Sequence, residues 1–185
     1  MTKENQQTTT GITSIKEGNV IHQKITNPFI KMIKNALREQ LIILQKRKEE
    51  LETWDNDAQD RFKKVFGFTN EKARQWILSG IEKEIALNQN IPISNFKKID
   101  ENVYASVIAT DLTHIIKIGK KFIKAPVTGN DSQVLTLCHE MSHFDDILGT
   151  EDLGGSSPRN FAKSLARNGD ERTMQSSYNF EMYFL

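Results

Sequence analysis

The sequence contains a single cysteine, Cys138, among its 185 residues. No disulfide can form within the chain, which fits a protein made in a reducing compartment. Apolar runs are also short, and none approaches the roughly 20 residues that a helix needs to cross a bilayer. The polar start, MTKENQQTTTGITSIKEGN, lacks the apolar core of a secretory signal. Sec-type export is therefore not indicated, although a protein made in the cytoplasm can still be exported or delivered to another cell by a specialised system.

An excess of charge of one sign is absent too. The 25 Lys and Arg residues nearly balance the 24 Asp and Glu residues, for a formal net charge of +1. Nucleic-acid-binding domains usually carry a strong basic field, so we expect no nucleic-acid partner. The length is that of one domain.

The pattern of apolar residues predicts a fold of the α+β class, predominantly helical with a small β-sheet. Residues 1–27 read as a flexible polar leader, and residues 28–185 as a single domain. The first half of that domain, 28–92, is expected to be helical, and the second half, 93–185, to hold the sheet and a motif-bearing helix. Expected features along the chain are a helix that begins at Pro28, helices over 57–66 and from Thr69 or Asn70, short strands within 102–110 and 114–126, and a helix over 131–148.

The last of these helices carries the sequence HEMSH, residues 139–143. His139 and His143 lie one helical turn apart, so their imidazoles can converge on one ion. Glu140 can reach the open side of such an ion and act as the general base on a zinc-bound water, as the same spacing does in metalloproteases. The pattern therefore predicts one catalytic Zn²⁺.

The plain alternative is an amphipathic helix that carries two histidines by chance. The apolar stripe of this helix consists of Val134, Leu137, Cys138, Met141, Phe144 and Leu148. Because neither histidine nor Glu140 belongs to this stripe, the pattern favours the zinc site. A catalytic zinc needs a third protein ligand. Glu151, Asp152 and Glu171 are the candidates, and spacing does not choose among them. Asp145 and Asp146 are better placed to hold an imidazole N–H.

The motif resembles that of the aspzincin metalloendopeptidases, the deuterolysin-type family with lysine-specific members. These proteins combine His-Glu-x-x-His with Gly-Thr-x-Asp, and HEMSH at 139–143 and GTED at 149–152 match both halves. The resemblance implies a zincin-like metalloprotease fold, with His139, His143 and Asp152 as zinc ligands and Glu140 as the base. Flanking similarities in RFKKVFG, IKIGKKFIKAPVTGNDSQVLTLCHE and YNFEMYF extend it over most of residues 30–185.

The sequence departs from the family pattern in two places. Gly155 stands where the family has a tyrosine thought to hydrogen-bond the developing oxyanion. Another donor would then be required, and the candidates are Tyr178, Tyr183, His114 and Arg172. In lysine-specific members the closing segment carries an aspartate three residues before a glutamate. Here Tyr178 takes the place of the aspartate while Glu181 keeps that of the glutamate, so lysine specificity is not expected to carry over.

These features predict a zinc metalloendopeptidase that hydrolyses proteins or peptides, with the strand around IIKIGKKF as one site for pairing with an extended substrate. A secreted or delivered bacterial toxin or effector is one form of this hypothesis, with a secretion apparatus and an inhibitor or immunity protein as further partners. The alternatives are a zinc-containing binding module with little turnover, suggested by Gly155, and a hydrolase of cell-wall peptides.

Overall fold

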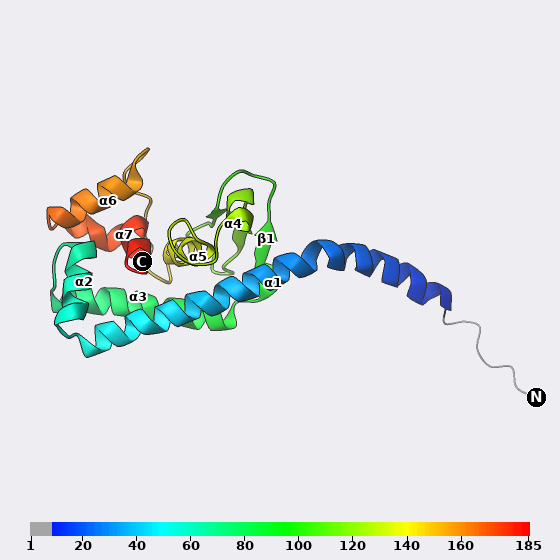
Figure 1. Cartoon of the computed structure of the whole chain (residues 1–185), viewed down its shortest axis with the longest axis horizontal. Helices are drawn as coiled ribbons and strands as arrows, with labels where there is room; N and C mark the ends of the chain where they lie inside the picture. Colours follow the sequence, from blue (N-terminus) through cyan, green and yellow to red (C-terminus); the bar gives the residue numbers. More distant parts are fainter. Residues whose placement is uncertain (1–8) are drawn as a thin grey trace, which may run out of the picture.

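The computed structural model describes the backbone of residues 9–185 and the side chains from residue 27 onward. The first eight residues of the expected leader lie outside this range. The described part folds into seven α-helices, two short 3₁₀ helices and one small sheet (Figure 1). This agrees with the α+β, predominantly helical class that the sequence predicts.

Helix α1 (Thr9–Thr53) is the longest element, and its N-terminal part runs away from the rest of the molecule (Figure 1). The prediction that this helix begins at Pro28 was wrong, because Pro28 lies inside it. A proline removes one backbone hydrogen bond of a helix, and here the helix continues past that loss. Ile33, Leu37 and Leu44 recur at helical spacing on one face of α1 and are buried.

Helices α2 (Asn56–Phe66) and α3 (Glu71–Asn90) begin and end close to where the sequence predicts. Asp55 and Asn70 cap their N-termini by accepting hydrogen bonds from the amides of Ala58 and Ala73. Helix α3 packs along α1 and turns the chain back across the molecule (Figure 1). The two long helices form the layer on which the remaining elements rest.

The sheet consists of β1 (Phe96–Lys98), β2 (Ala105–Ser106) and β3 (Ile116–Ile118), in the order β1-β3-β2. A 3₁₀ turn, η1 (Ile93–Asn95), leads into it. Strand β3 pairs in parallel with β1 and antiparallel with β2, so it lies in the middle and β2 lies at one edge. The strand character expected up to residue 126 ends early, because residues Lys120–Lys124 form helix α4.

Helix α5 (Gln133–Ser142) carries the HEMSH sequence and lies at the centre of the molecule. All ten of its residues are buried, against α1, α3, the sheet and α7 (Ser177–Met182). Helix α6 (Pro158–Arg167) and the turn η2 (Glu171–Gln175) complete the chain between α5 and α7. Burial on every side fixes the orientation of α5, and hence of its histidines.

The expected helix over 131–148 is wrong at its C-terminal end, because α5 stops at Ser142. The amides of the next two residues already bond three residues back, and the amide of Asp145 bonds to the carbonyl of Ala109 instead. Gly149, with φ of +60°, then reverses the chain. The amide of Thr150 reaches back to the carbonyl of Ser142 at 3.0 Å. These contacts direct the next residues toward the face of α5 that bears the histidines.

Among the helices of the described range, none is both long enough and apolar enough to cross a membrane.

The glycine that ends α2 provides a test of this packing. Gly67 has φ of +90°, and a Cβ there would collide with the carbonyl oxygen of Ala166 at the end of α6. Gly129 has almost the same φ, +91°, but open space around it. We expect Gly129→Ala to cost about 1 kcal/mol from the backbone conformation alone, and Gly67→Ala to cost clearly more. Urea unfolding of the two variants measures the difference, and equal losses would contradict the close packing of α2 against α6.

Candidate metal centre

His139 lies in the last turn of α5 and His143 caps its C-terminus, and both side chains face the same side. Their rings lie 4.8 Å apart between centroids and are nearly perpendicular, at 82°. Ser132 caps the N-terminus of α5 by accepting a hydrogen bond from the amide of Leu135. The histidine spacing therefore produces the convergence that the sequence predicts.

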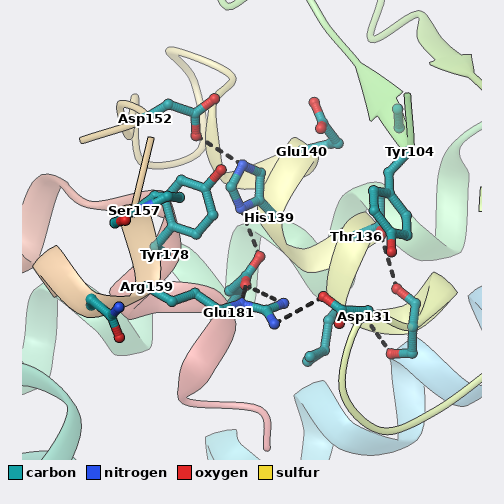
Figure 2. Close-up of a pocket in the computed structure, with 15 residues that line it drawn as sticks. Tyr104, Asp131, Thr136, His139, Glu140, Asp152, Ser157, Arg159, Tyr178 and Glu181 are labelled. Carbon is teal, nitrogen blue, oxygen red and sulfur yellow. Dashed lines mark hydrogen bonds and ion pairs between the residues drawn. The ribbon is translucent and has the colours of Figure 1, made fainter. Parts of the chain in front are cut away.

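Asp152 reaches this pair from the loop that follows Gly149. Its Oδ1 lies 2.9 Å from Nε2 of His139 and 3.4 Å from Nε2 of His143. Ser177, at the start of α7, donates a hydrogen bond to the same oxygen at 2.7 Å. One ligand atom from each of the three residues lies within 4.8 Å of the others, and Figure 2 shows Asp152 facing His139 across the cleft.

The outer nitrogen of each imidazole has its own partner. Nδ1 of His139 lies 2.8 Å from Oε2 of Glu181, and Nδ1 of His143 lies 2.7 Å from the carbonyl oxygen of Thr150. Both partners can accept a hydrogen bond from Nδ1–H, and in that tautomer the lone pair of Nε2 is directed at the cluster. Two such imidazoles and one carboxylate oxygen are the donor set of a catalytic zinc site, so these residues fit the ion.

The ionisation of the three side chains supports this fit. Burial lowers the pKa of His139, but the carboxylates of Asp152 and Glu181 outweigh burial and raise that pKa to about 10. Hydrogen bonds from both histidines hold the pKa of Asp152 well below its usual range. A cation is thus electrostatically favoured here, and zinc would take the place of the histidine protons.

Glu140 lies beside the metal cluster on the same cleft, and its side chain points away from Glu181 toward the open side (Figure 2). Burial raises the pKa of this carboxyl group, although His139 and His143 oppose the shift. A carboxylate with a raised pKa next to a metal site is suited to proton transfer.

The cleft has a volume of about 480 Å³ and lies between the sheet, α5, α6 and α7. Tyr104 and Ala105 form the wall nearest the sheet, and Arg159 and Tyr178 the opposite wall (Figure 2). The ring of Tyr178 stands edge-on to that of His139, with centroids 4.8 Å apart. Burial, and then the nearby carboxylates, raise the pKa of its hydroxyl, which stays protonated at neutral pH.

Several other residues that the sequence offered as candidate ligands or ligand partners lie away from the two histidines. Glu151 is exposed, and Glu171 lines a separate hollow with Trp76 and Met174. Asp146 pairs with His114 at 2.9 Å, and Asp145 is exposed. These two aspartates were candidates for holding the imidazole N–H groups of His139 and His143, but Glu181 and Thr150 take that position.

Two functional contacts had no signal in the sequence. Thr150 uses its backbone carbonyl, which any residue type would supply. Arg159 reaches Glu181 and Asp131 from α6. A single arginine in a helix of ordinary composition carries no sequence pattern that would place it at a cleft. Glu181 was noted for its place in the closing segment, but its contact with His139 joins residues 42 positions apart.

The sequence and the fold were compared with those of known proteins. The family model for aspzincins, described as lysine-specific metallo-endopeptidase, matches residues 52–185. The chain belongs to the aspzincin family. Members of this family are metallopeptidases that use one zinc ion, in agreement with the zinc predicted from the sequence.

Curated aspzincin relatives match over part of their length. An extracellular protease of Aeromonas hydrophila is 34% identical over 80 residues, which cover 43% of this chain and 22% of that protein. A peptidyl-Lys metalloendopeptidase of Armillaria mellea is 34% identical over 84 residues, covering 45% and 23%. The matches thus span less than a quarter of each relative.

A solved zinc peptidase from Grifola frondosa has the same fold, with a TM-score of 0.73 and 24% identity over 85% of this chain and 94% of that one. This likeness supports the zincin-like fold.

The third ligand can be tested with adjacent carboxylates. We expect Asp152→Ala to lower zinc affinity by about 100-fold or more, because it removes one of three protein ligands. Glu151→Ala is the matched control, since Glu151 is the neighbouring exposed carboxylate, and it should leave affinity unchanged. Competition with a chromogenic chelator measures both. A loss with Glu171→Ala instead of Asp152→Ala would contradict this ligand set.

Proposed function

We propose that this chain is a zinc-dependent endopeptidase in which His139, His143 and Asp152 hold the ion and Glu140 is the general base. The observation that supports this most strongly is the convergence of both Nε2 atoms and the Asp152 carboxylate at one point of an open cleft. The His-Glu-x-x-His spacing of residues 139–143 has, in this proposal, the role it has in other metalloproteases.

A zinc ion held there would polarise the scissile carbonyl and would lower the pKa of an attacking water to near neutrality. Glu140 would accept one proton from the attacking water as the water oxygen bonds to the carbonyl carbon. The same carboxyl group would return that proton to the amide nitrogen as the C–N bond breaks, which releases a carboxylic acid and an amine and leaves Glu140 unchanged. Burial raises the pKa of this carboxyl group, and its place beside the two histidines suits it to both proton transfers.

Tyr178 takes the part of the missing tyrosine at position 155. Gly155 has φ of +53° and no neighbour within reach of a Cβ, so a side chain there would face open space. Among the four alternative donors, Tyr178 lines the cleft, whereas Tyr183 is fully buried, Arg172 pairs with Asp170, and His114 pairs with Asp146. In Figure 2 the Tyr178 hydroxyl lies near Asp152 and His139. A protonated phenol at that point can stabilise the developing oxyanion.

Glu181 serves to orient His139 in this proposal, and does not bind substrate directly. Its Oε2 accepts from Nδ1 of His139, and its side chain is only 7% exposed. A carboxylate in this position fixes the tautomer of a ligating imidazole and raises its basicity.

The substrate is a protein or peptide in extended conformation, and we place it along β2. The earlier candidate, the strand around IIKIGKKF, is β3, and both of its edges are already paired. Strand β2 is an edge strand whose Ala105, with neighbouring Tyr104, lines the cleft. Strand addition there would bring a peptide bond past the metal centre.

Export from the cell agrees with the Aeromonas hydrophila relative, which is named an extracellular protease. The narrower role of a delivered toxin or effector, with its secretion apparatus and immunity protein, stays a prediction from the sequence. The zinc-containing binding module is a weaker candidate, because a site without turnover has no need for Glu140 beside the metal.

The role of Glu140 is tested by a substitution that keeps its shape. We expect Glu140→Gln to reduce hydrolysis of an unfolded protein by about 1,000-fold or more, because general base catalysis is lost. Zinc content should stay that of the wild type. New termini read by mass spectrometry, together with metal analysis, measure both effects. Cuts made equally by wild type and variant would remove Glu140 from the mechanism.

The role of Tyr178 is tested by removing only its hydroxyl. Tyr178→Phe should lower kcat by about 100-fold with little change in KM or zinc affinity, because an oxyanion donor acts in the transition state. Tyr183→Phe is the matched control and should retain activity, because Tyr183 is fully buried outside the cleft and its hydroxyl has no hydrogen-bond partner among the described residues. An unchanged kcat in Tyr178→Phe would mean that another group stabilises the oxyanion.

A further inference from the structure

Arg159 joins three segments of the chain at the back of the cleft. It lies in the first turn of α6, after Pro158 at the helix start. Its Nε donates a hydrogen bond to Oε1 of Glu181 at 3.1 Å, and its Nη2 and Nη1 form ion pairs with Oε1 of Glu181 at 3.0 Å and with Oδ1 of Asp131 at 2.8 Å. Figure 2 shows the guanidinium between these two carboxylates, below His139.

The contact leaves Glu181 with little capacity for another cation. Oε1 accepts a hydrogen bond from Nε of Arg159 and forms an ion pair with its Nη2, and Oε2 accepts a hydrogen bond from His139. The side chain of Glu181 is 7% exposed, whereas that of Arg159 is 35% exposed. The side chain of Arg159 is therefore the more accessible of the two partners to a substrate.

This arrangement matters for a lysine side chain. Two of the relatives are named peptidyl-Lys metalloendopeptidases, and selection of an ammonium group requires an acidic partner that is free to pair with it. Here a lysine that approached Glu181 would come close to the positive charge of Arg159, and the carboxylate is already satisfied. Asp131 is more exposed, at 58%, but it too pairs with Arg159.

The remaining walls of this part of the cleft suit an uncharged side chain. Leu135 and Thr136 come from α5, and Tyr104 and Tyr178 provide ring surfaces on either side. Burial disfavours the charge of Arg159, but Glu181 and Asp131 more than compensate and raise its pKa, so the guanidinium stays charged throughout the range of enzyme assays.

We propose that Arg159 is a specificity-determining residue that pairs with Glu181 and thereby directs the cleft toward neutral substrate side chains and away from lysine. This rests on the proposed peptidase function, and it adds the class of residue recognised beside the cleaved bond. Arg159 acts on substrate choice through the charge it places against Glu181.

The test uses pairs of peptides in which one position holds either lysine or its neutral analogue norleucine. Pairs are made for positions on both sides of the cleaved bond. Wild-type zinc-loaded protein should cut the norleucine peptides at least as fast as the lysine peptides. Arg159→Gln should raise the lysine-to-norleucine ratio of kcat/KM by about tenfold, because a buried carboxylate is freed for a charge-assisted hydrogen bond.

Two further variants separate charge from structure. Arg159→Lys keeps a cation beside Glu181 and should keep the neutral preference. Arg172→Gln is the matched control, since Arg172 also pairs with an aspartate but lies on the exposed turn η2. A lysine preference in the wild type, or an unchanged ratio in a zinc-loaded Arg159→Gln protein, would overturn the proposal.

A binding measurement distinguishes this proposal from the peptidase function itself. The same peptides are titrated by fluorescence anisotropy into zinc-loaded Glu140→Gln protein and into the Glu140→Gln, Arg159→Gln double variant. Norleucine peptides should bind more tightly to the first, and lysine peptides should gain about tenfold in the second. If the wild type cuts nothing but this reversal occurs, the peptidase function fails and the role of Arg159 stands. Unchanged relative affinities would overturn the role of Arg159.

Discussion

The turn that follows α5 is the constraint on which the rest of the site depends. It ends the helix at Ser142, reverses the chain at Gly149 and brings the carboxylate of Asp152 to 2.9 Å from Nε2 of His139. The same turn presents the carbonyl of Thr150 to Nδ1 of His143. One short backbone segment thus supplies a candidate ligand and the partner that orients another, so ligand position and imidazole orientation cannot vary independently.

The C-terminal helix completes what the turn begins. Glu181 fixes His139 from α7, and Ser177 of the same helix holds Asp152. Arg159 then balances the charge of Glu181 from α6. Because each contact joins a different element to the buried helix α5, the site is held by the packing of the whole C-terminal half. Its preorganisation limits the reorganisation that zinc binding requires.

Local signals in the sequence predicted local features. Gly67 and Asn70 marked helix ends, and the four-residue spacing of His139 and His143 predicted their convergence. The end of α5 was missed because it depends on Ala109, which is distant in sequence. Spacing alone did not choose among Glu151, Asp152 and Glu171 as ligands, and the family resemblance implied Asp152. In the folded chain Asp152 is the one of the three that lies with the two histidines. The pairing of Arg159 with Glu181 could not be predicted for the same reason: it arises where two helices meet.

Zinc K-edge X-ray absorption on the zinc-loaded protein tests the central claim most directly. The account predicts two imidazole nitrogens at about 2.0–2.1 Å and otherwise oxygen ligands at similar distances, with no sulfur. Asp152→Ala should change the oxygen contribution and leave both imidazoles in place. A sulfur ligand, which could come only from buried Cys138 or a methionine, or a single imidazole, would contradict a centre formed by His139, His143 and Asp152.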